Sequence, residues 1–194
     1  MPAGFTGRSC PAPPETVLVD DAVEVVVDAV ESASGHRRVV LVDGPSGAGK
    51  TTLAARMVEA RPSWQVVHAD DLHEGWFGLD RAWRLDWLWS ATPAYRRWDW
   101  DLHRWGGTVE VDPSRPVVVE GCGVVTPGQA RRATLSLWCH LDPGRARQRA
   151  LSREPQFAQW WAAWAVQQEW HRVRHHPDRC ADVVVDCSLT PAGT

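Results

Sequence analysis

The stretch VVLVDGPSGAGKTT, residues 39–52, decides the fold of this chain of 194 residues. It opens with a continuous apolar run, which is typical of a strand buried on both faces of a parallel sheet. A glycine-rich turn follows, and residues 50–60 then place apolar side chains on one face of an expected helix. Lys50 stands where the turn meets this helix. Of the 21 lysine and arginine residues in the chain, Lys50 is the only lysine.

Residues 44–51 satisfy the pattern G-x-x-x-x-G-K-[ST], and a strand before it with a helix after it is the context that confirms this phosphate-binding motif. Its glycines let successive N–H groups face inward around phosphate oxygens, and the dipole of the following helix favours negative charge. Lys50 is expected to reach the β- and γ-phosphates in a space too narrow for a planar guanidinium, and Thr51 to place its hydroxyl on Mg²⁺. The predicted nucleotide-binding residues are Gly44, Pro45, Ser46, Gly47, Ala48, Gly49, Lys50, Thr51 and Thr52. Because no second lysine exists for an N-K-x-D guanine motif, ATP is favoured over GTP.

The rest of the chain alternates between strand and helix patterns, which predicts an α/β fold. Apolar runs predict strands at 38–43, 64–70, 115–121, 135–142 and 181–186. Helices are expected at 20–34, 50–60, 79–91, 127–134, 143–153 and 156–175; the last has Phe157, Trp160, Trp161, Trp164 and Gln168 along one face. We therefore expect a P-loop NTPase three-layer sandwich with a central five-stranded parallel sheet. Residues 17–188 would form this single domain, between a disordered lead-in at 1–16 and a tail at 189–194.

Composition excludes several classes of protein. The formal net charge of −3 does not indicate a basic surface for nucleic acid or an anionic membrane. The sequence contains no run of eighteen apolar residues, the length that a membrane-spanning helix needs. The five cysteines lack a CxxC pair or regular spacing, which indicates reduced thiols and a cytoplasmic protein. The sequence is compatible with a monomer or a homodimer.

Acidic side chains follow two of the expected strands. Asp70 and Asp71 come at the end of the second strand and Glu120 at the end of the third. The carboxyl ends of parallel strands carry the ligand sites in such sheets. We expect Asp70 to accept the proton of an acceptor hydroxyl and also to be a metal-binding residue, and Glu120 to hold Mg²⁺ with Thr51. Either Asp70 or Asp71 could be the base. Asp71 could instead cap a helix or turn, and Glu120 could cap the end of its strand.

Two further groups of side chains are candidates for the site. Arginines at 145, 149 and 153 share a face of the expected helix at 143–153, and Arg145, Arg149 and Arg153 could close over the γ-phosphate as a lid at 143–154. Tryptophans gather in the segment 71–110, where Trp76, Trp98 and Trp100 could stack on an acceptor. Nearby acids there would favour a cationic, amine-bearing ligand. These tryptophans could line the pocket, belong to the hydrophobic core or form a subunit interface.

The motifs GPSGAGKTT, HADDLHEGW, YRRWDWDLHR, VVVEGCG and the spaced arginines together resemble the uridine kinase-like branch of P-loop kinases, which includes phosphoribulokinase and bacterial pantothenate kinase. The resemblance covers about residues 36–187. It implies that Asp70 is the base, with Asp71 and His73 at the neighbouring positions of the family's D-S-F-Y segment, and that Glu120 binds Mg²⁺. It also implies that the acceptor site includes Trp98, Asp99, Trp100 and His103, which match the family's Y-D-F-x-x-H segment with tryptophan at both aromatic positions.

These observations predict an enzyme that uses ATP and Mg²⁺ to phosphorylate a hydroxyl of a small molecule, with a nucleoside-like acceptor favoured. One alternative is a kinase of another metabolite or of an antibiotic. Another is a P-loop ATPase or nucleotide sensor that acts on a protein partner.

Overall fold

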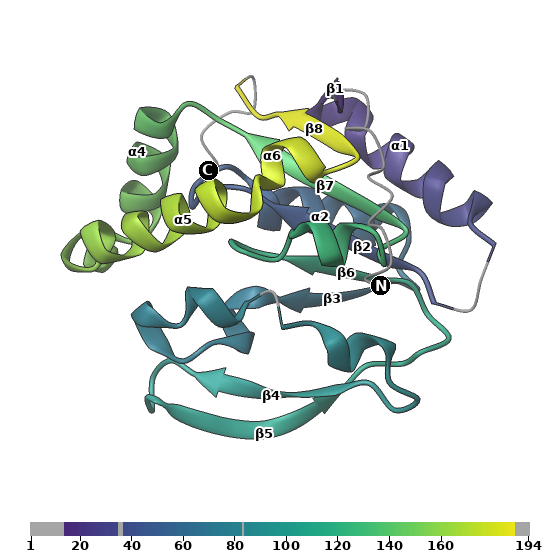
Figure 1. The fold of residues 1–194 in the computed structure, drawn as a ribbon, viewed down its shortest axis with the longest axis horizontal. Coiled ribbons are helices and arrows are strands. Elements are labelled where there is room, and N and C mark those ends of the chain that lie inside the picture. The colour runs from purple at the N-terminus through teal and green to yellow at the C-terminus, as the bar shows by residue number, and fades with distance from the viewer. Residues whose placement is uncertain (1–13, 35–36, 83, 189–194) are drawn as a thin grey trace, which may run out of the picture.

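The computed structural model describes residues 14–34, 37–82 and 84–188. Six parallel strands form its central sheet in the order β1-β8-β7-β2-β6-β3 (Figure 1). The bounds of these strands are β1 Glu15–Leu18, β2 Val39–Asp43, β3 Gln65–His68, β6 Val117–Glu120, β7 Leu135–His140 and β8 Val183–Asp186. The chain moves from β2 to one side of the sheet through β3 and to the other side through β7, so the carboxyl end of β2 lies where the strand order reverses.

The five predicted strands are confirmed, and the predicted number of strands is corrected from five to six. The additional strand is β1, which pairs in parallel with β8 at the edge of the sheet. Because β1 begins at Glu15, the disordered lead-in expected at residues 1–16 overlaps the start of this strand. Residues 1–13 and the tail at 189–194 lie outside the described residues.

Two helical layers cover the sheet, as a three-layer sandwich requires. Alternate side chains of β2 point to opposite faces, so Val40 and Val42 join one apolar core while Val39 and Leu41 join the other. The first core is closed by α1 (Val19–Ser32) and α2 (Lys50–Ala60). The second is closed by α5 (Trp161–His175) and by the turns that follow β3.

The segment 71–110 differs from its expected structure. The described residues of 79–91, which exclude residue 83, form no α-helix but two 3₁₀ turns, η3 (Leu79–Arg81) and η4 (Asp86–Trp89). The buried side chains Leu79, Ala82, Leu85 and Leu88 recur every three residues, which suits the 3.0-residue turn of a 3₁₀ helix better than the 3.6-residue turn of an α-helix. Beyond these turns, β4 (Ala94–Asp99) and β5 (Arg104–Glu110) form an antiparallel ribbon below β3 (Figure 1).

The remaining elements are helix α4 and several short helical turns. The predicted helix at 143–153 is confirmed as α4 (Pro143–Arg153), which Asp142 caps by accepting a hydrogen bond from Arg145 N at 3.0 Å. The helix expected at 156–175 is divided into the 3₁₀ turn η5 (Pro155–Gln159) and α5. The other short elements are η1 (Ala69–Leu72), η2 (Gly75–Phe77), α3 (Pro127–Ala130) and α6 (Pro177–Cys180).

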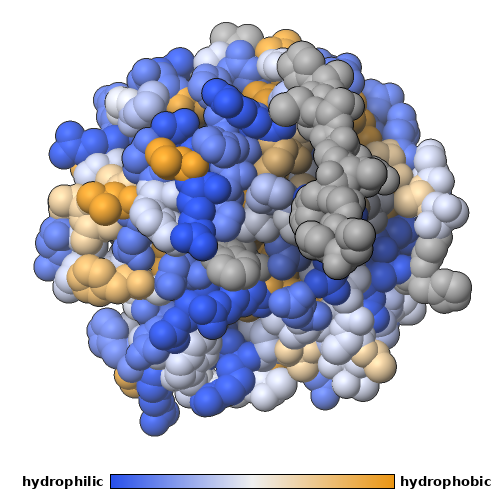
Figure 2. Space-filling view, viewed as in Figure 1, coloured by the Kyte–Doolittle hydropathy of each residue, from blue (hydrophilic) through white to orange (hydrophobic). Residues whose placement is uncertain are grey.

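The visible surface is mostly hydrophilic, with separate apolar patches (Figure 2). Exposed apolar side chains on α5 include Val166, Trp170 and Val173. No helix within the described residues is long and apolar enough to cross a membrane.

Candidate active site

The glycine-rich loop joins β2 to α2 at the centre of the sheet edge. Gly49 caps α2 in the left-handed conformation with φ of 100°, and the first N–H groups of the helix have no partner within it. Lys50 is buried and donates hydrogen bonds to Gly44 O at 2.9 Å and to Pro45 O at 3.0 Å. This combination of free N–H groups, helix dipole and ammonium makes a binding site for phosphate groups.

The ammonium of Lys50 keeps its charge despite its burial. Removal from water lowers the pKa of Lys50, but the neighbouring Cys122, Glu120 and Asp43 outweigh this effect and raise the pKa to about 12. Lys50 Nζ also lies 3.4 Å from Cys122 Sγ. The loop therefore holds a permanent positive charge that is ready for an anionic ligand.

Helix α5 holds the loop in place through side chains that the sequence had shown only as an apolar helical face. Trp164 Nε1 donates to Ser46 Oγ at 2.8 Å, and Ser46 N donates to Gln168 Oε1 at 2.7 Å. One turn further along, His171 Nε2 lies 3.2 Å from Asp43 Oδ2, and both side chains are buried. The spacing of three to four residues between Trp164, Gln168 and His171 indicates that these side chains share one face of a helix. It does not indicate that this face contacts the phosphate-binding loop.

The carboxylate of Asp43 fixes the start of the loop. It accepts hydrogen bonds from the backbone N–H groups of Gly44, Gly123 and Val125 at 2.7, 2.9 and 2.8 Å. The loop after β2 is thereby tied to the segment after β6. Asp43 was not among the predicted site residues, because an acid at the end of a buried strand does not reveal its partners.

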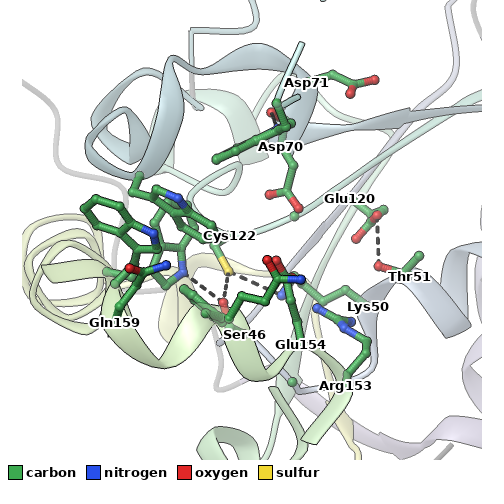
Figure 3. Close-up of a pocket in the computed structure, with 18 of the residues that line it drawn as sticks. Ser46, Lys50, Thr51, Asp70, Asp71, Glu120, Cys122, Arg153, Glu154 and Gln159 are labelled. Carbon is green, nitrogen blue, oxygen red and sulfur yellow. Dashed lines mark hydrogen bonds between the residues drawn. The ribbon is translucent and has the colours of Figure 1, made fainter. Parts of the chain in front are cut away.

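The side chain of Glu120 lies beside the start of α2. Thr51 Oγ1 donates to Glu120 Oε1 at 3.1 Å, as the dashed line in Figure 3 shows. His68 Nδ1 lies 2.6 Å from the same oxygen, and this hydrogen bond raises the pKa of His68. A hydroxyl and a carboxylate at the phosphate end of the site are the hard oxygen ligands that Mg²⁺ prefers, and Mg²⁺ commonly takes only one or two protein ligands beside phosphates. Thr51 and Glu120 therefore fit a magnesium ion.

The two aspartates after β3 point in different directions (Figure 3). Asp70 points into the site, on the side of Lys50 and Glu120. It lines the cavity and remains open to solvent, although protein atoms surround it on several sides. This partial desolvation raises the pKa of Asp70, but His73 at 3.7 Å, Lys50 and Arg153 outweigh it, and the pKa is lowered. Asp71 instead pairs with Arg97, at 3.1 Å between Oδ1 and Nε.

The three arginines of the expected lid do not act as one group. Arg153, at the end of α4, lines the same cavity as the phosphate loop, and it forms no ion pair with any described residue. Arg149 donates to Cys187 O at 3.4 Å, just after β8, and the charge of Arg145 helps to lower the pKa of Asp186 at the end of β8. The prediction of a lid is therefore corrected to Arg153, because Arg145 and Arg149 lie near the end of β8, whereas Arg153, the last residue of α4, reaches the cavity.

A cavity of about 640 Å³ extends from the phosphate loop to an aromatic wall, which consists of Trp76, Trp100, Phe157, Trp160 and Trp164. Of the expected acceptor residues, Asp71, Trp76, Trp100 and His103 line this cavity. His73, Trp98 and Asp99 do not line it: His73 and Trp98 are buried, and Asp99 accepts hydrogen bonds from the N–H groups of residues 101 and 102. The lining also includes residues that were not predicted as site residues, namely Asp101, Gly121, Cys122, Glu154, Gln156, Phe157, Gln159, Trp160 and Trp164.

The central parallel sheet, the loop after β2 and the cavity at the carboxyl edge define a P-loop nucleotide-binding protein. A family model described as an AAA domain matches residues 39–102. Over 51 residues the chain is 43% identical to the serine/threonine-protein kinase PknK of Mycobacterium tuberculosis and Mycobacterium bovis. This match covers 23% of the chain, which spans only 5% of the length of these curated relatives.

Solved structures match the chain over most of its length. A candidate uridine kinase from Bacillus stearothermophilus superposes with a TM-score of 0.61 at 19% identity, over 87% of this chain and 99% of that chain. A candidate fructose transport system kinase from Silicibacter sp. TM1040 gives a TM-score of 0.59 at 15% identity, over 87% and 98%. The chain has the fold of P-loop kinases, and the expected resemblance to the uridine kinase-like branch is confirmed at the level of the fold.

Proposed function

We propose that the protein is a kinase that transfers the γ-phosphate of ATP to a hydroxyl of a small molecule, with Mg²⁺ bound at the phosphates. The observation that carries this proposal is that Asp70 shares one cavity with Lys50 and Arg153. A carboxylate that can take a proton thus faces two cations that can stabilise a transferring phosphoryl group.

The proposed step is an in-line displacement. The acceptor oxygen attacks the γ-phosphorus while its proton passes to a carboxylate oxygen of Asp70, and the bond from phosphorus to the β,γ-bridging oxygen breaks to release ADP. The low pKa of Asp70 keeps the carboxylate ionised and able to accept this proton. Lys50, Arg153 and the loop N–H groups hold the equatorial oxygens in place. Mg²⁺ held by Thr51 and Glu120 would neutralise charge on the phosphates.

The acceptor side of the cavity suits a molecule with apolar or planar faces. Trp76, Trp100 and Phe157 contribute aromatic surface there. A nucleoside is the acceptor that the resemblance implies, and an amine-bearing acceptor is the class that the acidic residues imply. A cytoplasmic location stays a prediction that rests on the cysteines.

The test is ADP release from ATP and Mg²⁺, with and without pools of nucleosides, sugars and aminoglycosides. Stimulation by one pool that disappears in Lys50→Ala would support the proposal, and division of that pool would identify the acceptor. Constant release that no pool changes would contradict it, and would favour an ATPase with a protein partner. ATP binding without release would favour a nucleotide sensor.

A further inference from the structure

Two carboxylates in the cavity have no role in the proposed reaction. The lining contains five carboxylates, Asp70, Asp71, Asp101, Glu120 and Glu154, against the two permanent cations Lys50 and Arg153. Glu120 contacts Thr51 and His68, Asp71 pairs with Arg97, and Asp70 faces the phosphate loop. Neither Asp101 nor Glu154 forms an ion pair or a side-chain hydrogen bond with a described residue.

Both carboxylates lie next to the aromatic wall in the chain. Asp101 follows Trp100 in the turn between β4 and β5, and Trp100 is fixed by a hydrogen bond of 3.0 Å from its Nε1 to Asp70 O. Glu154 stands between α4 and η5, the turn that carries Phe157. The two acids therefore flank the acceptor side of the cavity from two separate segments.

The aromatic wall itself is built of rings in mutual contact. The centroid of Trp76 lies 4.8 Å from that of Phe157, in a stacked arrangement, and 4.9 Å from that of Trp100. Trp160 stacks on Trp76 at 6.1 Å, and Trp164 meets it edge-on at 6.0 Å. Trp76 and Trp100 line the cavity and are only partly buried, and indole faces that stay open to it attract ammonium groups as well as apolar or planar ones.

We propose that the acceptor is an alcohol that carries an ammonium group, such as an amino sugar or an amino alcohol. This inference rests on the proposed function and names the substrate class of the same cavity. The ammonium would lie against the indole faces with Asp101 and Glu154 as counter-charges, and the hydroxyl would point to Asp70.

Charge explains why this class fits better than the others. An acidic acceptor would bring its charge beside carboxylates that have no partner among the described residues. A neutral acceptor could stack on the indoles but would gain no attraction from the two carboxylates, which are exposed at the rim of the cavity. ATP bound at the loop adds further negative charge, so an ammonium group is the acceptor feature that improves the balance.

The experiment uses pairs of compounds that differ in charge and little else. Choline is compared with 3,3-dimethylbutan-1-ol, and 2-amino-2-deoxyglucose with glucose. Binding is measured by calorimetry on the full chain with Mg²⁺ and a non-hydrolysable ATP analogue. We expect the charged member of at least one pair to bind about tenfold tighter than its neutral partner.

Three variants test whether Asp101 and Glu154 cause the preference for the charged compound. Asp101→Asn and Glu154→Gln are each expected to weaken binding of the charged compound by about threefold or more and to leave the neutral one within about twofold. Asp80→Asn is the control, because Asp80 is an exposed acid that does not line the cavity. Its expected effect on either compound is below about twofold.

The inference and the proposed function fail in different ways. Equal binding within every pair, or a preference that persists in both Asp101→Asn and Glu154→Gln, overturns the inference. If a neutral nucleoside then stimulates ADP release, the kinase stands with another acceptor. If the charged compounds bind selectively but no acceptor stimulates release, the ammonium site stands and the kinase is overturned.

Discussion

His68 Nδ1 lies 2.6 Å from Glu120 Oε1, the same oxygen that accepts a hydrogen bond from Thr51 at 3.1 Å. The hydrogen bond to Glu120 raises the pKa of His68 above its ordinary value of 6.5, against a smaller opposing effect of burial. In its protonated form His68 occupies this carboxylate and repels a divalent cation. The pair stabilises the fold fully below pH 6.5, and this contribution is lost as the pH rises through the raised pKa.

We therefore predict that affinity for Mg²⁺ rises as His68 loses its proton. The apparent Mg²⁺ affinity, measured from ADP release at fixed ATP, should increase by about five- to tenfold as the pH passes through the raised pKa. His68→Ala should flatten this dependence and bind Mg²⁺ more tightly at low pH. If His68→Ala and the wild type show the same dependence of Mg²⁺ affinity on pH, protonation of His68 does not cause that dependence.

Lys50 should not tolerate arginine. Its ammonium is buried between two loop carbonyls at 2.9 and 3.0 Å, a space that does not accommodate a planar guanidinium. Lys50→Arg and Lys50→Met are both expected to lower kcat/KM for ATP by at least about 100-fold. Thermal unfolding of each variant would verify that it is folded. An arginine variant within tenfold of the wild type would contradict this prediction.

Asp70 and Asp71 should differ sharply although they are adjacent. Asp70→Asn removes the proton acceptor and should lower kcat by about 10²–10⁴-fold with little change in nucleotide affinity. Asp71→Asn breaks only the pair with Arg97, whose side chain is 63% exposed, so kcat should stay within about threefold of the wild type. Comparable losses in the two variants would mean that Asp70 alone is not the base.

Arg153 should matter far more than Arg145, although both lie on α4. Arg153 lines the cavity, so Arg153→Ala should lower kcat by about 10²-fold or more through lost stabilisation of phosphoryl charge. Arg145 does not line the cavity, and Arg145→Ala should change kcat by less than about threefold. Single-turnover rates would separate this effect on chemistry from product release.

Gly47 occupies an unrestricted position of the motif, yet it should not accept alanine. Its φ is 85°, and an added Cβ would lie 2.1 Å from Ala146 O of α4. Gly47→Ala should destabilise the fold by about 2 kcal/mol or more and lower Tm by about 5 °C or more. Gly107→Ala is the matched control, because a Cβ there meets no atom within 4 Å. Equal Tm values for the two variants would rule out this steric account.

Local patterns in the sequence predicted the features that depend on neighbouring residues. The apolar runs of β2, β3, β6, β7 and β8 and the loop at 44–51 could be recognised because strand burial and phosphate binding each leave their pattern within a few residues. The segment 79–91 was mistaken for an α-helix, since buried residues at a spacing of three also occur within a helical pattern. The β4–β5 ribbon was missed for lack of a distinctive turn sequence.

The sequence by itself determined that this chain builds a parallel sheet with a phosphate-binding loop, because both follow from short-range pattern and backbone conformation. Only the tertiary structure decided which side chains serve the loop. Trp164 and Gln168 reach Ser46 across 118 and 122 residues of chain, Asp70 rather than Asp71 points into the cavity, and Arg153 rather than Arg145 joins it. These outcomes depend on how helices pack against the sheet edge, and packing between distant segments leaves no mark on the spacing of residues within either segment.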